Sequence, residues 1–219
     1  MVFTDPPYNV DYTPDGHRPI ANDALGSAFA RFLGAACGAM LEVTKGAIYI
    51  CMSSSEIGTL KHAFEGAGGH WSTFVIWSKT SFTLGRTDYQ RQYEPILYGW
   101  PRGTDHYWCG ARDQGDVWSL AKPVRNDLHP TMKPIALVER AIRNSSKTRD
   151  RILDPFGGSG TTLMAAEATG RLAALVELDP AYCDVIIRRW QEQTGGTATR
   201  EDGMAFASLV AADGQGAAS

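Results

Sequence analysis

The chain has 219 residues, with a hydrophobic content of 43% and a charged content of 21%, which is ordinary for a globular protein. This length suits one well-buried domain and is short for two large ones. The net charge of −3 gives no overall basic signature of nucleic-acid binding, and no apolar run approaches the roughly 20 residues that cross a bilayer.

Apolar periodicity in the first hundred residues predicts alternating strands and helices. Asp5-Pro6-Pro7 ends the first, very short apolar run, and Gly46 follows the first helical pattern as a stop signal. The pattern predicts, in chain order, a strand at 1–4, a loop at 12–23, a helix at 24–44, a strand at 47–52, a helix at about 56–66, and strands at 71–78 and 95–100.

The middle of the chain is irregular. Residues 80–92 predict a polar loop, and residues 99–128 combine little periodicity with many Gly, Trp, Arg and Asp residues. A structureless segment of that length in a compact domain is usually functional or mobile.

The last third has the clearest pattern. It predicts a helix at 134–145, a strand at 151–154, a helix at 161–169, a strand at 173–177 and a helix from 180 to about 193. Strands that alternate with helices indicate a parallel sheet with crossover helices. We therefore expect an α/β fold in a single domain over residues 1–207, followed by a disordered Ala- and Gly-rich tail at 208–219.

A glycine-rich turn, Asp154-Pro155-Phe156-Gly157-Gly158-Ser159-Gly160, joins a predicted strand to a helix that starts near Thr161. Free backbone N–H groups at a helix N-terminus favour negative charge on a ligand. The spacing differs from the G-x-G-x-x-G of dinucleotide binders and lacks the G-K-[ST] ending of a P-loop. Glu177, at the end of the next strand, is placed to accept hydrogen bonds from ribose hydroxyls. These features favour an adenosine-containing ligand, with a tight turn and a helix-capping acid as the structural alternative.

Asp5-Pro6-Pro7-Tyr8 offers rigid acceptors beside an aromatic ring. The two prolines fix the backbone and remove two donors, so the carbonyls of Asp5 and Pro6 remain as acceptors. Such a set suits the exocyclic amino group of a planar base, because accepting its hydrogens draws the nitrogen towards sp³ and aims its lone pair. For these four residues alone, a strand terminator with a surface tyrosine is the alternative.

Together with His129-Pro130-Thr131-Met132-Lys133-Pro134, these motifs resemble those of the S-adenosylmethionine-dependent amino-methyltransferases of DNA. In that family D-P-P-Y is the catalytic motif and D-P-F-G-G-S-G-T-T is the methionine-binding loop. The motif order, with the catalytic motif first, is that of the β group. The resemblance implies a Rossmann-like fold with a mostly parallel, doubly wound sheet and a circularly permuted motif order. Segments near 110–117, 176–179 and 188–191 are also similar to methylase domains that occur joined to ParB-like nuclease domains.

The resemblance also implies roles for the motif residues. Asp5 and Pro6, in one motif with Pro7, would hold the target amino group while Tyr8 stacks on a base flipped out of the duplex. Glu177 would bind the ribose of the cofactor. The residues expected around the rest of S-adenosylmethionine are Asp154, Pro155, Phe156, Gly157, Gly158, Ser159, Gly160, Thr161, Asp179, His129, Thr131 and Lys133.

Asp rather than Ser at position 5 favours adenine N6 over cytosine N4. The resemblance therefore predicts a site-specific DNA adenine-N6 methyltransferase of the restriction–modification type, acting by base flipping and direct displacement. A target-recognition region is expected at about 81–128. Its arginines are candidates for contacts with phosphates or guanines, although solvated side chains would give the same pattern: Arg86, Arg91, Arg102, Arg112 and Arg125.

Other functions stay open at this point. They are an N4-cytosine DNA methyltransferase, an RNA or protein-amide methyltransferase, and a non-catalytic DNA-binding remnant of a larger protein. A similar clamp suits any planar amine, but the motif order counts against an RNA or protein substrate. The intact Asp5 and glycine turn count against a remnant.

One acid of the family pattern has no counterpart before Asp5. Family members usually have a Gly-Asp segment upstream of the D-P-P-Y strand, and its acid contacts the cofactor adenine, whereas four residues precede Asp5 here. A third strand of the last unit would fall at 197–203, so we expect Asp202 to replace that acid. The alternative is a truncated chain with weaker cofactor binding.

The remaining expectations concern metals, compartment and assembly. Cys37, Cys51, Cys109 and Cys183 show no paired zinc-ligand spacing, and the five histidines are dispersed, so we infer no metal site. Reduced thiols favour the cytoplasm of a bacterial or phage-type system rather than secretion or a membrane. DNA is the expected partner, and homodimers are common among similar proteins, although no feature here requires one.

Overall fold

The computed structural model describes residues 1–11, 21–84, 88–110, 112–121 and 132–209. Residues 206–209 are helical, and the rest of the expected tail, 210–219, lies outside the described residues. The elements are β1 (Val2–Thr4), a 3₁₀ turn (Gly26–Ala28), α1 (Phe29–Val43), β2 (Ile48–Cys51), α2 (Ile57–Gly66), β3 (Gly69–Thr83), β4 (Arg91–Pro101), β5 (Val117–Ser119), α3 (Ile135–Ser145), β6 (Arg151–Asp154), α4 (Thr161–Ala168), β7 (Leu172–Leu175) and α5 (Pro180–Thr194).

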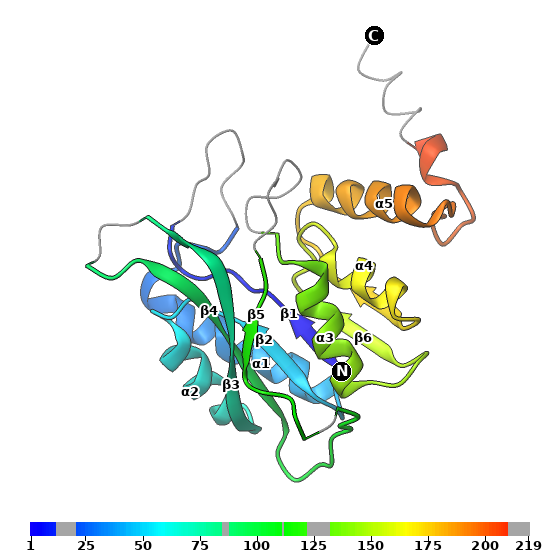
Figure 1. Cartoon of the computed structure of the whole chain (residues 1–219). Helices are drawn as coiled ribbons and strands as arrows, with labels where there is room; N and C mark the ends of the chain where they lie inside the picture. Colours follow the sequence, from blue (N-terminus) through cyan, green and yellow to red (C-terminus); the bar gives the residue numbers. More distant parts are fainter. Residues whose placement is uncertain (12–20, 85–87, 111, 122–131, 210–219) are drawn as a thin grey trace.

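The strands of the described residues form one seven-stranded sheet in the order β5-β3-β4-β2-β1-β6-β7 (Figure 1). β1 pairs in parallel with both β2 and β6, while β6 pairs in parallel with β7 and β3 with β5. Within this described sheet, β4 runs against the other strands, since it is antiparallel to both β2 and β3. The predicted α/β fold with a mostly parallel sheet is thereby confirmed.

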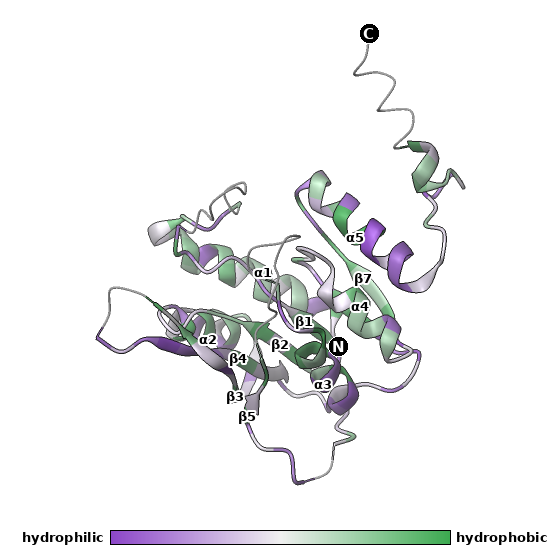
Figure 2. Ribbon diagram, turned by 45° about the horizontal axis from the view of Figure 1, so that its top comes forward, coloured by the Kyte–Doolittle hydropathy of each residue, from purple (hydrophilic) through white to green (hydrophobic). Residues whose placement is uncertain are grey.

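Helices cover both faces of the sheet because its central strands are apolar on both sides. Successive residues of a strand point to opposite faces, and Ile48, Tyr49, Ile50 and Cys51 of β2 are all buried. Ile48 and Ile50 pack with α1 and α2, whereas Tyr49 and Cys51 pack with α3 and α4. Figure 2 shows the apolar character of β1 and β2 against the strongly hydrophilic residues of α5. The sheet is therefore doubly wound, as expected.

The topology brings the two sequence motifs together at the carboxyl ends of two neighbouring central strands. From β1 the chain continues outward to β2, and from the neighbouring β6 it continues outward to β7 in the opposite direction. The carboxyl ends of β1 and β6 therefore lie side by side at a topological switch point, which is where open α/β sheets bind ligands.

Three details differ from the sequence-based expectation. The hairpin strands β3 and β4 extend into residues expected to be a loop, and β5 forms in a segment with little periodicity. Residues 197–203 do not add a strand to the sheet. They make a local turn, with an isolated bridge between Thr199 and Ala205, because the N–H of Gly203 bonds back to the carbonyl of Arg200.

Among the described residues, no helix is long and apolar enough to cross a bilayer.

We expect Ile50→Ala to lower the free energy of unfolding by about 2–5 kcal/mol, because Ile50 is fully buried at the centre of the sheet and its loss leaves a cavity. Urea unfolding of the purified chain measures this change. The matched control is Leu172→Ala on the edge strand β7, where the side chain is 56% exposed and we expect a change within about 0.5 kcal/mol. Equal losses at both positions would contradict the assignment of the core.

Candidate active site

A cavity of about 610 Å³ opens at the carboxyl ends of β1 and β6. Asp5–Tyr8, Asp154–Ser159 and Glu177 all contribute to its lining. The volume lies in the range of small-molecule binding sites. Two motifs that stand 150 residues apart, measured from Thr4 to Asp154, thus face a single cavity.

The glycine turn between β6 and α4 uses backbone conformations that favour glycine. Gly158 and Gly160 have φ values of +52° and +82°, a region in which other residues are strained. A Cβ atom on Gly160 would lie 3.0 Å from the side chain of Ile186 on α5, so the glycine also lets the turn pack closely against α5. Gly160 itself is not among the lining residues, whereas Thr161 at the start of α4 is.

Asp154 ties this turn to β1. Its side chain is 4% exposed and accepts hydrogen bonds from Thr4 Oγ1 at 2.7 Å, Thr162 Oγ1 at 2.6 Å and the Phe156 N–H at 3.1 Å. Burial raises the pKa of the Asp154 carboxyl to about 7, against the opposing effect of these hydrogen bonds. The carboxyl therefore joins β1, the turn and α4, and near pH 7 its protonated and ionised forms are similarly populated.

Glu177 holds the same turn from the side of β7. Its Oε2 accepts the Gly158 N–H at 2.6 Å, and its Oε1 accepts the N–H groups of Leu178 and Asp179 at 2.8 and 2.9 Å. Asp179 caps α5 through the Ala181 N–H at 2.9 Å, as the sequence predicts. Oε1 is saturated by two donors, so Oε2 is the oxygen with room for a ligand hydroxyl.

Asp5 and Tyr8 belong to a compact network of charges. Tyr8 Oη lies 2.5 Å from Asp5 Oδ1 and 2.6 Å from Glu94 Oε1. Lys133 Nζ lies 2.6 Å from Asp5 Oδ2 and 2.7 Å from Glu94 Oε1. Lys79 Nζ lies 2.9 Å from Glu94 Oε2. The same cavity is lined by these five residues and by Pro6 and Pro7.

The network shifts the proton affinities of its members in opposite directions. Burial raises the pKa of Asp5, and the effects of the Lys133 ammonium and of Glu94 oppose each other there. Burial would also raise the pKa of Glu94, but Lys133 and Lys79 outweigh it and lower that pKa to about 2. The two carboxylates raise the pKa of Lys133 against the lowering effect of burial. Glu94 and Lys133 are thus firmly charged, whereas Asp5 binds a proton more readily than a solvated aspartate.

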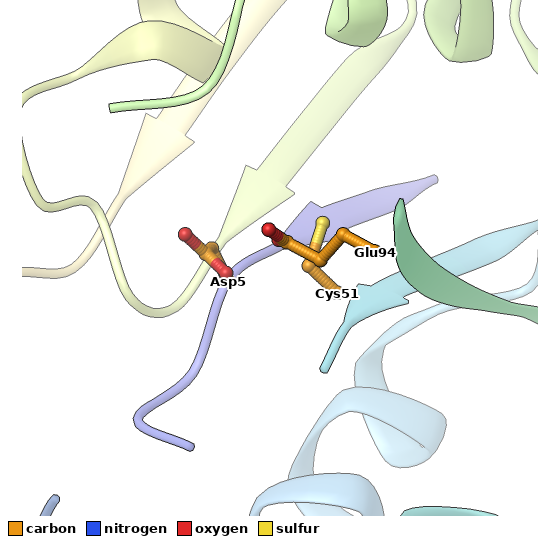
Figure 3. Close-up of side chains that lie close together, drawn as sticks. All are labelled: Asp5, Cys51 and Glu94. Atoms are coloured by element: carbon orange, nitrogen blue, oxygen red, sulfur yellow. The ribbon is translucent and has the colours of Figure 1, made fainter. Parts of the chain in front are cut away.

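Cys51, Asp5 and Glu94 bring potential metal-ligand atoms within 4.8 Å of one another (Figure 3). The Lys133 ammonium already bonds to both carboxylates of this group. Burial also raises the pKa of the Cys51 thiol well above its usual value, which disfavours the thiolate that binds metals. We therefore interpret the cluster as an ion-pair network.

Two predicted cofactor residues form contacts that the sequence did not predict. The Lys133 ammonium contacts Asp5 and Glu94 rather than the glycine turn. Asp202 is exposed and is not among the lining residues, because its carboxylate pairs with Arg200 and accepts the Met204 N–H at 3.1 Å within the local turn. The structural premise for Asp202 as the missing acid is therefore wrong, since residues 197–203 add no strand to the sheet that the described residues form.

Among the described residues, the three predicted DNA-contacting arginines lie apart from one another. Arg91, at the start of β4, donates to Ser53 Oγ at 3.2 Å, on the cavity side of the sheet. Arg102 lies beyond the other end of β4, with its guanidinium 3.4 Å from the Gly69 carbonyl. Arg112 is exposed between β4 and β5. His129, Thr131, Arg86 and Arg125 lie outside the described residues.

Sequence reasoning missed several lining residues, among them Trp77, Lys79 and Glu94 on the far side of β2. They come from β3 and β4, which reach the cavity only because β4 inserts between β2 and β3. One signal was available: Glu94 directly precedes the apolar run of β4, and an acid at such a position is rarely buried without a partner.

Comparisons with known proteins agree with this geometry. A family model described as DNA methylase matches residues 1–188. The type II methyltransferase M2.DpnII of Streptococcus pneumoniae is 32% identical over 166 residues, which cover 68% of this chain and 61% of that protein. The chain spans about three fifths of the length of the curated relatives that it matches.

Solved structures share the fold. The DNA modification methylase TTHA0409 of Thermus thermophilus, crystallised with S-adenosylmethionine, superposes with a TM-score of 0.63 at 24% identity and covers 89% of this chain and 86% of its own. The PvuII DNA methyltransferase, described as cytosine-N4-specific, gives a TM-score of 0.66 at 19% identity, with 86% and 78% coverage. At this identity, the likeness establishes the architecture alone.

The raised pKa of Asp154 predicts a pH dependence of stability. The Asp154 carboxyl keeps its proton up to about pH 7 in the folded chain, but only up to about pH 4 in the unfolded chain. Protonation of Asp154 therefore stabilises the fold fully below pH 4, and this stabilisation is lost as the pH rises through 7. We expect the free energy of unfolding of the wild type, minus that of Asp154→Asn, to fall by roughly 2–4 kcal/mol over this range. Urea unfolding of both proteins between pH 4.5 and 8 measures the difference. A difference that stays constant or rises would show that Asp154 is ionised in the folded chain.

Proposed function

The chain belongs to the DNA methylase family whose members include N6-adenine and N4-cytosine methyltransferases, and on this premise we propose that it transfers a methyl group from S-adenosylmethionine to the exocyclic N6 of adenine in DNA. One observation carries the proposal. The Asp5–Tyr8 clamp and the glycine turn line a single cavity at the switch point of the sheet, so a base amino group and a methyl donor can meet there.

The residues of the glycine-turn side fit S-adenosylmethionine. This cofactor is a cation that supplies an electrophilic methyl group when bound. The buried Asp154 carboxyl, with its pKa near 7, is readily ionised by a neighbouring positive charge. Glu177 Oε2 can accept a ribose hydroxyl, and Phe156, Val176 and Leu178 offer apolar lining for an adenine ring. The backbone at the start of α4 suits a carboxylate.

The residues of the clamp fit a flipped base. Asp5 and the carbonyl of Pro6 can accept the two hydrogens of an exocyclic amino group, which turns the nitrogen lone pair towards the methyl group. Tyr8 offers a ring face for stacking. A base inside a duplex cannot reach this cavity, so the proposal requires base flipping. After transfer, the cationic amine can release its proton to Asp5.

The choice of adenine rests on Asp rather than Ser at position 5. Cytosine N4 is the alternative, since the fold is shared with a cytosine-N4-specific enzyme. We also propose a role in restriction–modification and a location in the cytoplasm, in line with the type II methyltransferases among the relatives and with four free cysteines. The target-recognition role of residues 81–128, a homodimer and the likeness to ParB-linked methylases stay predictions.

We expect Asp5→Ala to lower the rate of DNA methylation by at least about 10³-fold, because the variant loses the acceptor for the target amino group. The substrate is genomic DNA incubated with isotopically labelled S-adenosylmethionine, followed by mass spectrometry of the nucleosides, which separates N6-methyladenine from N4-methylcytosine. Calorimetric titration should show S-adenosylmethionine affinity within about threefold of the wild type. Loss of both methylation and S-adenosylmethionine binding would assign Asp5 a structural role. Formation of N4-methylcytosine by the wild type would overturn the choice of adenine.

Glu177→Ala should weaken S-adenosylmethionine binding by roughly tenfold or more, because it removes the carboxylate that holds the Gly158 N–H and faces the cavity. Asp202→Ala is the matched control, and we expect unchanged affinity because Asp202 pairs with Arg200 outside the cavity. Calorimetry measures both. The opposite ranking, with Asp202 critical and Glu177 dispensable, would contradict the placement of the cofactor.

A further inference from the structure

Glu94 is a charged cavity residue that lies outside every sequence motif. Its strand, β4, enters the sheet between β2 and β3, and this position brings the Glu94 carboxylate to Asp5 and Tyr8. A buried carboxylate is retained only where nearby partners compensate its desolvation. Two lysines supply that compensation, Lys133 at 2.7 Å and Lys79 at 2.9 Å. The role that we assign to Glu94 rests on the proposed methylation of a base amino group.

Both donors that contact Asp5 also contact Glu94. The Tyr8 hydroxyl is 2.5 Å from Asp5 and 2.6 Å from Glu94. The Lys133 ammonium is 2.6 Å from Asp5 and 2.7 Å from Glu94. Each donor can therefore be held by either carboxylate with little movement of its own side chain.

Lys133 Nζ donates to the Tyr8 oxygen at 3.1 Å, but the two shorter contacts of that oxygen with Asp5 and Glu94 need a hydrogen each. A phenol carries one hydrogen, and two contacts this short between oxygens each need one. Glu94 stands between two ammonium groups and stays ionised, whereas burial raises the pKa of Asp5. The consistent arrangement has Asp5 donating to the Tyr8 oxygen and Tyr8 donating to Glu94. In the protein without a base, Asp5 is thus engaged at both oxygens, with Tyr8 and with Lys133.

A target amino group needs an Asp5 oxygen that is ionised and accepts. If Lys133 lost Asp5 and found no other acceptor, a buried donor would be left unpaired, at a substantial cost in free energy. Glu94 removes this cost because it already contacts the Lys133 ammonium. The other titratable groups that face Asp5 are Cys51 on β2, which burial keeps as a neutral thiol, and Asp154 at the end of β6. Neither bonds to Tyr8 or Lys133 in the described residues.

We propose that Glu94 is a positioning residue for methyl transfer, which retains the Tyr8 hydroxyl and the Lys133 ammonium when a target amino group enters and so frees Asp5 to accept that group. The Asp5 proton leaves to solvent as the base enters. In the transfer, the N–C bond forms as the S–C bond breaks, and the electron pair of the broken bond stays on sulfur. The surplus proton of the methylated amine then returns to the Asp5 carboxylate.

The test compares the wild type, Glu94→Gln and Glu65→Gln. The control variant removes the same charge from an exposed pair with Lys61 on α2. Single-turnover methylation of DNA is followed from pH 5 to 9, with S-adenosylmethionine affinity and thermal unfolding measured in parallel. We expect Glu94→Gln to slow transfer by roughly tenfold to 100-fold at pH 7.5, with cofactor affinity within about twofold of the wild type.

The pH profile separates positioning from a merely structural role. Without the Glu94 charge, Lys133 pairs with Asp5 alone, so Asp5 loses its proton more easily and the acidic limb of the rate should move to lower pH. Glu65→Gln should leave both the rate and the profile unchanged. A wild-type rate for Glu94→Gln, or a slower rate with an unmoved limb, would overturn the proposal.

A second variant guards against a folding defect. Glu94→Asp keeps the negative charge on a side chain that is shorter by one methylene group. We therefore expect slower methyl transfer, with the acidic limb of the pH–rate profile at the same pH as in the wild type. If Glu94→Gln does not fold, a wild-type rate for Glu94→Asp overturns the proposal. The measurement on the wild type tests the proposed function separately. A wild-type protein that does not methylate DNA would refute that function, whatever the variants do. Methylation of cytosine instead of adenine would leave the test of Glu94 intact.

Discussion

The parallel pairing of β1 with β6 is the constraint on which the cavity depends. These two strands are far apart in the sequence, and the buried Asp154 carboxyl at the end of β6 bonds to Thr4 of β1 and to Thr162 of α4. Because Thr4 directly precedes Asp5, and Phe156 bonds to the same carboxyl, this side chain sets the distance between the clamp and the glycine turn. A direct displacement needs that distance to be fixed, since the reacting atoms must meet in line.

A second constraint is the balance of charge on the clamp side of the cavity. The Glu94 carboxylate is matched by the ammonium groups of Lys79 and Lys133, and Lys133 also contacts the Asp5 carboxyl. Such a network costs desolvation, and well-packed apolar residues would stabilise a fold at least as well. Its presence beside the D-P-P-Y motif is therefore better explained by chemistry than by stability. In the proposed function, burial makes Asp5 bind a proton more readily, and Lys133 opposes this effect.

Local sequence predicted those parts of the molecule that local physics decides. Gly158 and Gly160 adopt positive φ in the turn, Asp179 caps α5, and the apolar run of β2 is buried on both faces. The predictions that were wrong or absent involve long-range pairing. β5 is too short to show periodicity, and Asp202 satisfies its carboxylate locally instead of joining a strand. Lys133 has the motif of a cofactor ligand, yet its ammonium pairs with two acids that come from distant strands.

The sequence by itself determined the α/β class, the two motifs and the order in which they stand, because these depend on neighbouring residues. Only the tertiary structure decided which charges meet at the cavity. Glu94 and Lys79 enter it because β4 runs antiparallel between β2 and β3, which places the start of β4 beside the carboxyl ends of the parallel strands. Strand order is set by packing over the whole sheet, and no local pattern of residues encodes it.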